Sequence, residues 1–236
     1  MDSMQIHTIA TVSSPFTQKF GIPRQPGLAP SITAQIILGK EYSSPEAIEG
    51  LQDCSHIWLL FVFSQAVEQG WKPRVRPPRL GGNQKLGVFA SRSPFRPNHI
   101  GMSVVELITI EMRDKQLVLT VSGADLLDGT PIIDIKPYLP YADSLPQARY
   151  PLASSATLLT QKLVISNQAE QQITSLQGAY PCDLEQQISE LLRCDPRPAY
   201  QNDPERVYGV YLYDLNIRFS VNDTKINLLS IDKREA

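Results

Sequence analysis

Seven short segments rich in Val, Ile, Leu and Phe, each bounded by turn-forming residues, constrain the fold of the first 150 residues most strongly. They are Ile6–Val12, Ile32–Leu38, His56–Phe63, Lys85–Ala90, Ser103–Ile110, Leu117–Ser122 and Pro131–Ile135. Such segments are typical of β-strands, and Arg113–Gln116 indicates a hairpin turn between two of them. One short helix is expected at Pro45–Leu51, with Ser44 as its cap. Short strands with so little helix favour a closed or nearly closed barrel, which leaves few exposed strand edges.

The pattern changes near residue 151. Of the 19 prolines, 15 precede residue 152. Beyond it, Ala169–Leu176 and Leu184–Leu192 have helical spacing. Val207–Val221 and Lys225–Ile231 then predict a hairpin that turns at Asn222–Asp223. We therefore predict a mainly β fold, with a small closed β-barrel N-terminal domain over residues 1–155 and a smaller α+β C-terminal domain over residues 156–236.

Several classes of protein are disfavoured by the composition. The N-terminus lacks a basic start followed by an apolar run, and the longest apolar run, Ile57–Phe63, is too short to span a bilayer. We expect a cytoplasmic protein without membrane contact. The three cysteines are far apart and there are only three histidines, so we expect no metal site. The sequence also has no GxGxxG and no GxxxxGK[ST], the fingerprints of dinucleotide and NTP sites.

A basic segment stands out in an otherwise acidic chain. Residues 69–105 hold seven basic residues and no acidic one, whereas the rest of the chain holds 15 basic and 24 acidic residues. The seven are Lys72, Arg74, Arg76, Arg79, Lys85, Arg92 and Arg96. Such segregation suits a phosphate backbone. A solvated loop is an equally good interpretation of the charge alone.

Two further motifs concentrate polar groups. In Ser93–Gly101, two prolines fix the backbone around Arg96, beside Asn98 and His99. This is either an anion or nucleobase site or an elaborate turn, and a lone loop histidine is usually a hydrogen-bonding partner rather than a base. In Asp125–Tyr138, three carboxylates, a lysine and a tyrosine line either a polar pocket or a hydrogen-bonded turn.

Together, four ordered motifs resemble the TrmO (TsaA/YaeB-like) family of tRNA methyltransferases. They are Pro23–Gly27, Arg76–Gly82, Ser93–Gly101 and Asp128–Pro131 continued by Asp134–Tyr138. The segment Asp195–Tyr200 is also similar to that of bacterial members. The sequence departs from the family at Ser64, where relatives carry His, and at His99, where Pro is common.

The resemblance implies methyl transfer from S-adenosylmethionine to the exocyclic amine of threonylcarbamoyladenosine, next to the tRNA anticodon. It also implies a cofactor-holding β-barrel and a homodimer. The cofactor contacts that it implies are Pro26, Gly27, Leu28, Ser64, Gln65, Arg92, Val104, Ala124, Asp125, Leu126 and Leu127.

Alignment of donor and acceptor is the main task in such a methyl transfer. Asp128, Tyr138 and Asp134 are candidates for accepting the amine proton or orienting the carbamoyl group. We expect Arg74, Arg76, Arg79, Arg96 and Asn98 to contact the anticodon loop. Tyr208, Tyr211 and Tyr213 either stack on bases or form a half-buried strand. A non-catalytic RNA-binding module and a methyltransferase of a different substrate remain the alternatives.

Overall fold

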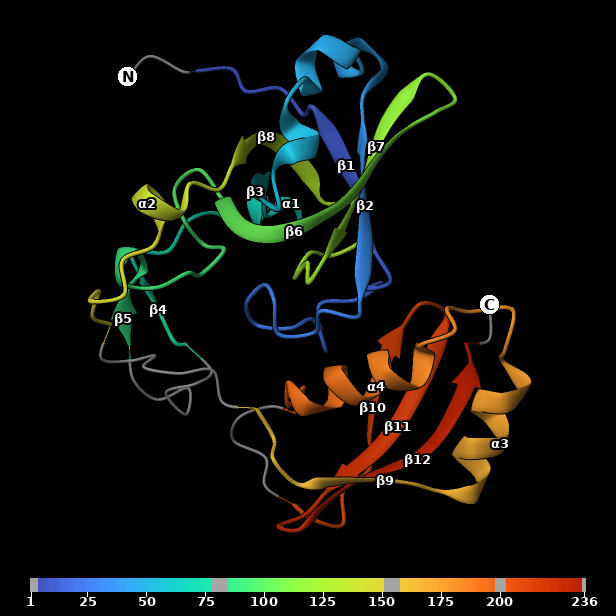
Figure 1. Ribbon diagram of the computed structural model, residues 1–236. Coiled ribbons are helices and arrows are strands. Elements are labelled where there is room, and N and C mark those ends of the chain that lie inside the picture. Colours follow the sequence, from blue (N-terminus) through green and yellow to red (C-terminus); the bar gives the residue numbers. More distant parts are fainter. Residues whose placement is uncertain (1–3, 78–84, 151–157, 198–202, 235–236) are drawn as a thin grey trace.

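The structure, a computed structural model, consists of a closed β-barrel followed by a smaller α+β unit (Figure 1). It describes residues 4–77, 85–150, 158–197 and 203–234. The barrel strands are β1 (Ala10–Ser13), β2 (Thr33–Leu38), β3 (His56–Val62), β6 (Ile100–Arg113), β7 (Gln116–Ser122) and β8 (Pro131–Pro137). Around the barrel they follow the order β1-β2-β7-β6-β3-β8, and every neighbouring pair is antiparallel. The predicted fold class is confirmed.

Alternation along the strands fills the barrel. In β3, Ile57, Leu59 and Phe61 are buried, whereas the residues between them are partly accessible. Because successive side chains of a strand point to opposite faces, these three residues belong to the barrel interior. The β6–β7 hairpin turns at Asp114 and Lys115, both with positive φ, as its sequence predicted.

The connections between the strands contain only short elements. These are the 3₁₀ turns Lys40–Tyr42, Pro45–Ile48, Leu51–Asp53 and Val88–Ala90, the helices α1 (Ser64–Val67) and α2 (Pro140–Asp143), and the two-stranded sheet of β4 (Arg74–Val75) and β5 (Leu86–Gly87).

Three local predictions require correction. The helix expected at Pro45–Leu51 is instead a pair of 3₁₀ turns, because Gly50 adopts φ +83° between them and Ser44 makes no cap bond to the backbone. The strand expected at Lys85–Ala90 is cut short by the 3₁₀ turn that starts at Val88. The first strand begins at Ala10 rather than Ile6.

The C-terminal unit is a four-stranded sheet with two helices. It contains β9 (Lys162–Ile165), α3 (Asn167–Ser175), α4 (Leu184–Arg193), β10 (Tyr208–Leu212), β11 (Leu215–Val221) and β12 (Lys225–Lys233). The sheet order is β10-β11-β12-β9, with β9 parallel to β12. The single strand predicted over Val207–Val221 is wrong, because the chain reverses at Tyr213, whose φ is +58°. The predicted turn at Asn222–Asp223 is present.

The loop between β1 and β2 joins the two units. Phe16, Ala29 and Ile32 from this loop belong to the same hydrophobic core as the buried face of α4. Ser31 donates from its backbone N and its Oγ to the two carboxylate oxygens of Glu190, at 2.8 and 2.7 Å. The loop is therefore fixed between the barrel and α4. The predicted boundary at residue 155 lies outside the described residues.

In the described part of the chain, no helix is long and apolar enough to cross a bilayer.

Candidate functional site

The segments predicted to hold the cofactor leave the barrel at one end. The end of β3 lies beside the start of β6, and the end of β7 lies beside the start of β2. Ser64 and Gln65 follow β3, Ala124–Leu127 follow β7, and Pro26–Leu28 precede β2. Antiparallel pairing thus brings three segments that are distant in sequence to the same end of the barrel, where the β1–β2 loop packs against α4.

Two glycines bring two of these segments into direct contact. Gly27 N donates to Gly123 O at 2.8 Å. Gly123 has φ +69°, and a Cβ on it would lie 3.0 Å from the Cα of Gly27. Gly27 has φ +76° and open space on its own Cβ side. The backbone around Gly27 is therefore accessible to a ligand on one side and packed against Gly123 on the other.

Asp125 forms the electrostatic centre of this region. Ser103 Oγ donates to Asp125 Oδ1 at 2.5 Å. Burial raises the pKa of Asp125 from its ordinary 3.8 to about 6, against the lowering effects of the Ser103 hydroxyl, its own backbone amide and the Arg92 charge. Arg92 is exposed and donates from Nη1 to Gln25 Oε1 at 2.6 Å. An accessible cation, a half-buried carboxyl group and an open glycine backbone therefore adjoin one another.

The other predicted cofactor residues differ in what they can offer. Ala124 and Leu126 are 3% and 2% exposed and belong to the barrel core, so only their main chain is free to contact a ligand. Val104 lies on β6 next to Ser103, and by strand alternation it faces the outside of the barrel. Ser64 and Gln65 are exposed at the start of α1.

Two side chains of the Ser93–Gly101 loop contact backbone carbonyls within it or just before it. Arg96 Nη1 donates to Val88 O at 3.3 Å and to Ser91 O at 2.8 Å. His99 has φ +51°, is buried, and its Nδ1 lies 2.8 Å from Pro94 O. Both side chains therefore shape the loop, as the turn interpretation predicted. Asn98 is exposed.

The three candidate catalytic residues do not converge. Asp128 Oδ1 accepts from Ser14 N at 2.9 Å, which is the turn-holding arrangement. Asp134 Oδ2 pairs with Lys136 Nζ at 2.8 Å on the exposed surface. Tyr138 packs against His56 and Trp58. Asp128 precedes β8 and Tyr138 follows it, so they lie at opposite ends of a seven-residue strand, which spans roughly 20 Å.

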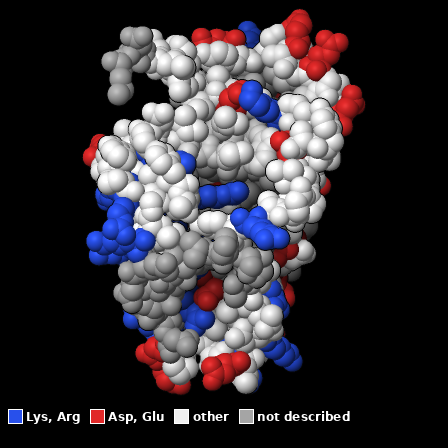
Figure 2. Space-filling model, turned by 90° about the vertical axis from the view of Figure 1, so that its left-hand side faces the viewer, with Lys and Arg blue, Asp and Glu red and all other residues white. Residues whose placement is uncertain are grey.

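The basic residues lie on the face that carries β4 and β5. Figure 2 shows Lys and Arg side chains gathered across the middle of this face, with carboxylates mostly toward its top and bottom. Lys72, Arg74, Arg76 and Lys85 are exposed. Arg79 lies outside the described residues. The three C-terminal tyrosines match the half-buried alternative better, because Tyr208 packs in the core against Phe219 and Tyr213 donates to Gln187 Oε1.

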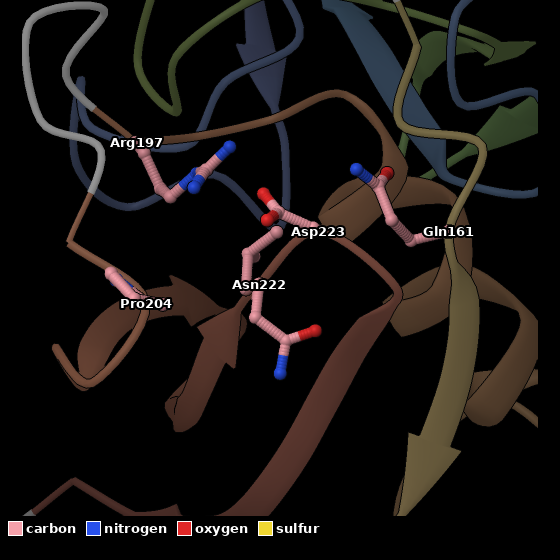
Figure 3. A pocket seen from close by; sticks show the side chains of 6 residues that line it. Gln161, Arg197, Pro204, Asn222 and Asp223 are labelled. Atoms are coloured by element: carbon pink, nitrogen blue, oxygen red, sulfur yellow. The ribbon is translucent and has the colours of Figure 1, made fainter.

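A polar hollow of about 320 Å³ lies apart from the barrel, in the C-terminal unit (Figure 3). Its lining residues are Gln161, Arg197, Pro204, Val221, Asn222 and Asp223. Arg197, from the Asp195–Tyr200 motif, pairs with Asp195 at 2.7 Å, and this hydrogen bond raises the pKa of Arg197. Residues 198–200 of the motif lie outside the described residues. Because its cation is neutralised, this hollow is a weaker anion site than the barrel end.

Ser103 and Gln25 are site residues that sequence reasoning missed. Ser103 is a hydroxyl at a buried position of a strand in which the next inward residue is Val105. A polar residue in an inward register usually has a partner, which was the available signal. Gln25 offered no such signal, because only the folded loop places it beside Arg92. Within the described ranges, no three His, Cys, Asp or Glu side chains are grouped to hold a metal ion.

Comparison with known proteins identifies the family. The tRNA-methyltransferase O N-terminal domain profile matches residues 11–144, and the TrmO C-terminal domain profile matches residues 160–234. The chain is 44% identical over 236 residues to the Escherichia coli tRNA (adenine(37)-N6)-methyltransferase, covering 99% of this chain and 100% of that protein. It is 46% identical over 215 residues, and 91% of each chain, to a putative S-adenosylmethionine-dependent methyltransferase, RcsF, of Pseudomonas aeruginosa.

A solved structure agrees with these sequence matches. A crystal structure of TrmO superposes with a TM-score of 0.81 at 38% identity, over 98% of this chain and 99% of that one. The resemblance predicted from the motifs is confirmed. Profile matches to both parts of the chain and a full-length relative therefore establish that this chain belongs to the TrmO family.

Proposed function

We propose that this protein is an S-adenosylmethionine-dependent methyltransferase that methylates the exocyclic amine of threonylcarbamoyladenosine beside the tRNA anticodon. The observation that carries the proposal is the barrel end at which Gly27, Arg92 and Asp125 adjoin. The full-length Escherichia coli relative bears the name of a tRNA adenine methyltransferase.

The residues at the barrel end suit the three chemical parts of S-adenosylmethionine. When bound, this cofactor supplies an electrophilic methyl group on a sulfonium. We propose that Arg92 pairs with its carboxylate and that the carboxylate of Asp125 faces its positive charge. The open backbone at Gly27, between Pro26 and Leu28, would contact the polar edges of the ligand.

The remaining predicted contacts follow from where side chains point. We propose that Ala124, Leu126 and Val104 contribute through the main chain, and that Leu127, Ser64 and Gln65 border the site. Ala124 and Leu126 are buried in the core, and Val104 faces away from Asp125.

Orientation rather than strong base catalysis is the chain's main contribution to the reaction. The acceptor nitrogen lies between a purine and a carbamoyl carbonyl, so its proton is more acidic than that of an ordinary amine. Holding donor and acceptor in line lowers a barrier by roughly 7–11 kcal/mol in well-oriented cases. Asp128, Asp134 and Tyr138 remain the candidates for accepting the proton or orienting the carbamoyl group, although the first two already have partners.

We propose that the basic face binds the anticodon loop. Exposed Arg74 and Arg76 would contact phosphates, with Arg79 beside them in sequence and Asn98 nearby in the Ser93–Gly101 loop. Arg96 would act mainly by fixing this loop, because its Nη1 is bonded to two carbonyls.

The quaternary state and location are also proposals. The outer face of β3 and β6 carries accessible apolar side chains, with Trp58 and Leu60 partly exposed and Met102 50% exposed. We propose that a second copy of the chain covers this face in a cytoplasmic homodimer. Met102→Glu should shift the protein to monomer in sedimentation equilibrium, whereas Met112→Glu on the projecting β6–β7 hairpin should not.

We also propose that the chain has two functional domains, with a boundary at about residue 155. Residues 1–155 would hold the cofactor and residues 156–236 would extend the tRNA contact.

A methylation assay tests the central proposal. Purified protein and S-adenosylmethionine are incubated with threonine tRNA carrying or lacking the threonylcarbamoyl group, and nucleosides are analysed by mass spectrometry. A gain of one methyl group on the modified nucleoside alone is expected. Methylation of both tRNAs would indicate a different acceptor. Binding of tRNA without affinity for S-adenosylmethionine would indicate the non-catalytic alternative.

A further inference from the structure

Phe89 is a large aromatic side chain that the fold holds in solvent. It lies in the middle of the 3₁₀ turn Val88–Ala90 and is 73% exposed. Trp71, three residues before β4, is 54% exposed. Large apolar side chains gathered on one face and rimmed by polar groups are a common mark of a binding surface.

The turn that carries Phe89 is anchored from three directions. Val88 is buried, and its N donates to Pro73 O at 3.0 Å. Tyr150 donates its hydroxyl to Ala90 O at 2.7 Å. Arg96 donates to Val88 O and Ser91 O on the third side. A side chain on so firmly held a turn loses little conformational freedom on binding.

One cation lies over the ring, and two more lie in or next to the strands that precede it. The Arg96 guanidinium carbon lies 5.7 Å from the Phe89 ring centroid. Arg74 pairs with Gly87 across the β4–β5 sheet, and Lys85 directly precedes β5. Residues 69–105 contain no carboxylate that would repel a polyanion. Aromatic rings among cations are how proteins hold unpaired bases, the ring by stacking and the cations through phosphates. A peptide partner would explain the ring but not the lack of acidic residues in the segment that carries it.

We propose that Phe89 is the stacking platform for an unpaired base of the RNA substrate, with Arg96 behind its ring and Arg74 and Lys85 directed to the flanking phosphates. This inference rests on the proposed function. Arg92 is three residues further along and bonded to the Gln25 loop, so a base on Phe89 lies beside the cofactor region. Phe89 is thereby assigned a positioning role in the same site.

The test compares three substitutions at Phe89 in the full-length protein. KM for threonylcarbamoyl-bearing threonine tRNA, kcat, and the Kd for S-adenosylmethionine are measured for Phe89→Ala, Phe89→Leu and Phe89→Trp. Loss of one stacked base should raise KM for tRNA roughly 5- to 150-fold in the Ala variant. The Leu variant should behave like Ala, because it lacks a π face, and the Trp variant should stay within about threefold of wild type. Cofactor affinity should not change.

Met112→Ala is the matched control. Met112 is 50% exposed on the β6–β7 hairpin, which Figure 1 shows projecting away from β4 and β5. Its substitution should leave KM for tRNA unchanged. All four variants should retain the wild-type circular dichroism spectrum, since neither side chain belongs to the buried cores.

Salt dependence separates stacking from phosphate contacts. Arg74→Gln should reduce the slope of log K against log salt for tRNA binding by about 0.7, the value for one lost contact to a single strand. Phe89→Ala should weaken binding without changing that slope.

Each outcome has a distinct meaning. A wild-type protein that transfers no methyl group refutes the proposed function. If the wild type is active, three results would refute the stacking role alone. They are an unchanged KM for tRNA in Phe89→Ala, a wild-type KM in Phe89→Leu, and a loss of cofactor affinity in the Phe89 variants. If Phe89→Ala loses only a protein partner, the platform serves protein binding and the inference fails.

Discussion

Replacing Asp125 by Asn should stabilise the cofactor-free protein near neutral pH. The pKa of Asp125 is raised from 3.8 to about 6, chiefly by burial. The unfolded chain therefore ionises this group at a lower pH than the folded chain does. The contribution of the protonated Asp125 carboxyl to the stability of the folded protein is therefore fully present below about pH 3.8. It is lost as the pH rises through about 6.

The magnitude follows from the two pKa values. At 1.36 kcal/mol per pKa unit, the ionised wild type is less stable at pH 7.5 by about 3 kcal/mol, an upper value because residual solvent access screens the charge. At pH 5 the same calculation gives roughly half of that loss of stability. Asn carries no charge and keeps an oxygen that can accept from Ser103 Oγ.

Urea unfolding of wild type and Asp125→Asn between pH 5 and 7.5 measures this difference. Asp223→Asn, at an exposed carboxylate, is the control for the change in net charge. We expect Asp125→Asn to gain about 1–3 kcal/mol at pH 7.5, with a smaller gain at pH 5. A variant that is no more stable than wild type at pH 7.5, or whose gain grows toward acid, would refute the reasoning. The same change should weaken S-adenosylmethionine binding roughly tenfold, or about 1.4 kcal/mol, if the carboxylate faces the sulfonium.

Three further predictions concern the groups that build the site. Gly123→Ala should destabilise the fold more than Gly50→Ala, because both substitutions add a Cβ at positive φ but only the first crowds Gly27. The difference between the two losses of stability, measured by thermal unfolding, should be about 1–3 kcal/mol. Glu190→Ala should lower the free energy of unfolding by about 1–3 kcal/mol because Ser31 loses both acceptors, whereas Glu185→Ala, exposed on the same helix, should change it by less than about 0.5 kcal/mol. Asp128→Asn should retain turnover, because Ser14 N needs an acceptor rather than a charge, whereas Asp128→Ala should lose about 1 kcal/mol of stability. An inactive Asp128→Asn variant would instead indicate that Asp128 accepts the proton.

The sequence predicted the barrel where alternation was strong and misplaced elements where one residue decided the backbone. β3 and β7 match their expected bounds within one residue, because their inward positions are uniformly apolar. The turn at Tyr213 was missed because a tyrosine at positive φ has no sequence signal; its hydroxyl bond to Gln187 and its N–H bond to Pro15 O accompany that conformation. Both partners are distant in sequence, Gln187 on α4 and Pro15 in the β1–β2 loop, so no local pattern contains these bonds.

The candidate site shows the same division. The sequence supplied the family resemblance, and through it Gly27, Arg92 and Asp125, but it could not supply their mutual contacts. Those contacts depend on the barrel register, which places Ser103 opposite Leu59 and lets the chain after β7 run along β6. A motif thus identified the chemical groups, whereas closure of the sheet determined which of them meet.

That distinction separates the residues that act on ligands from those that support them. Arg96 and His99 lie in the most conspicuous motif of the chain, yet Arg96 Nη1 is bonded to carbonyls of the preceding turn and His99 Nδ1 lies against Pro94 O. Their effect is to present neighbours, Phe89 and Arg92, that remain exposed. Arg96→Ala should therefore impair both tRNA and cofactor binding through loss of the loop, whereas Phe89→Ala should impair tRNA binding alone. The contrast between these two variants distinguishes a side chain that supports the site from one that contacts the substrate.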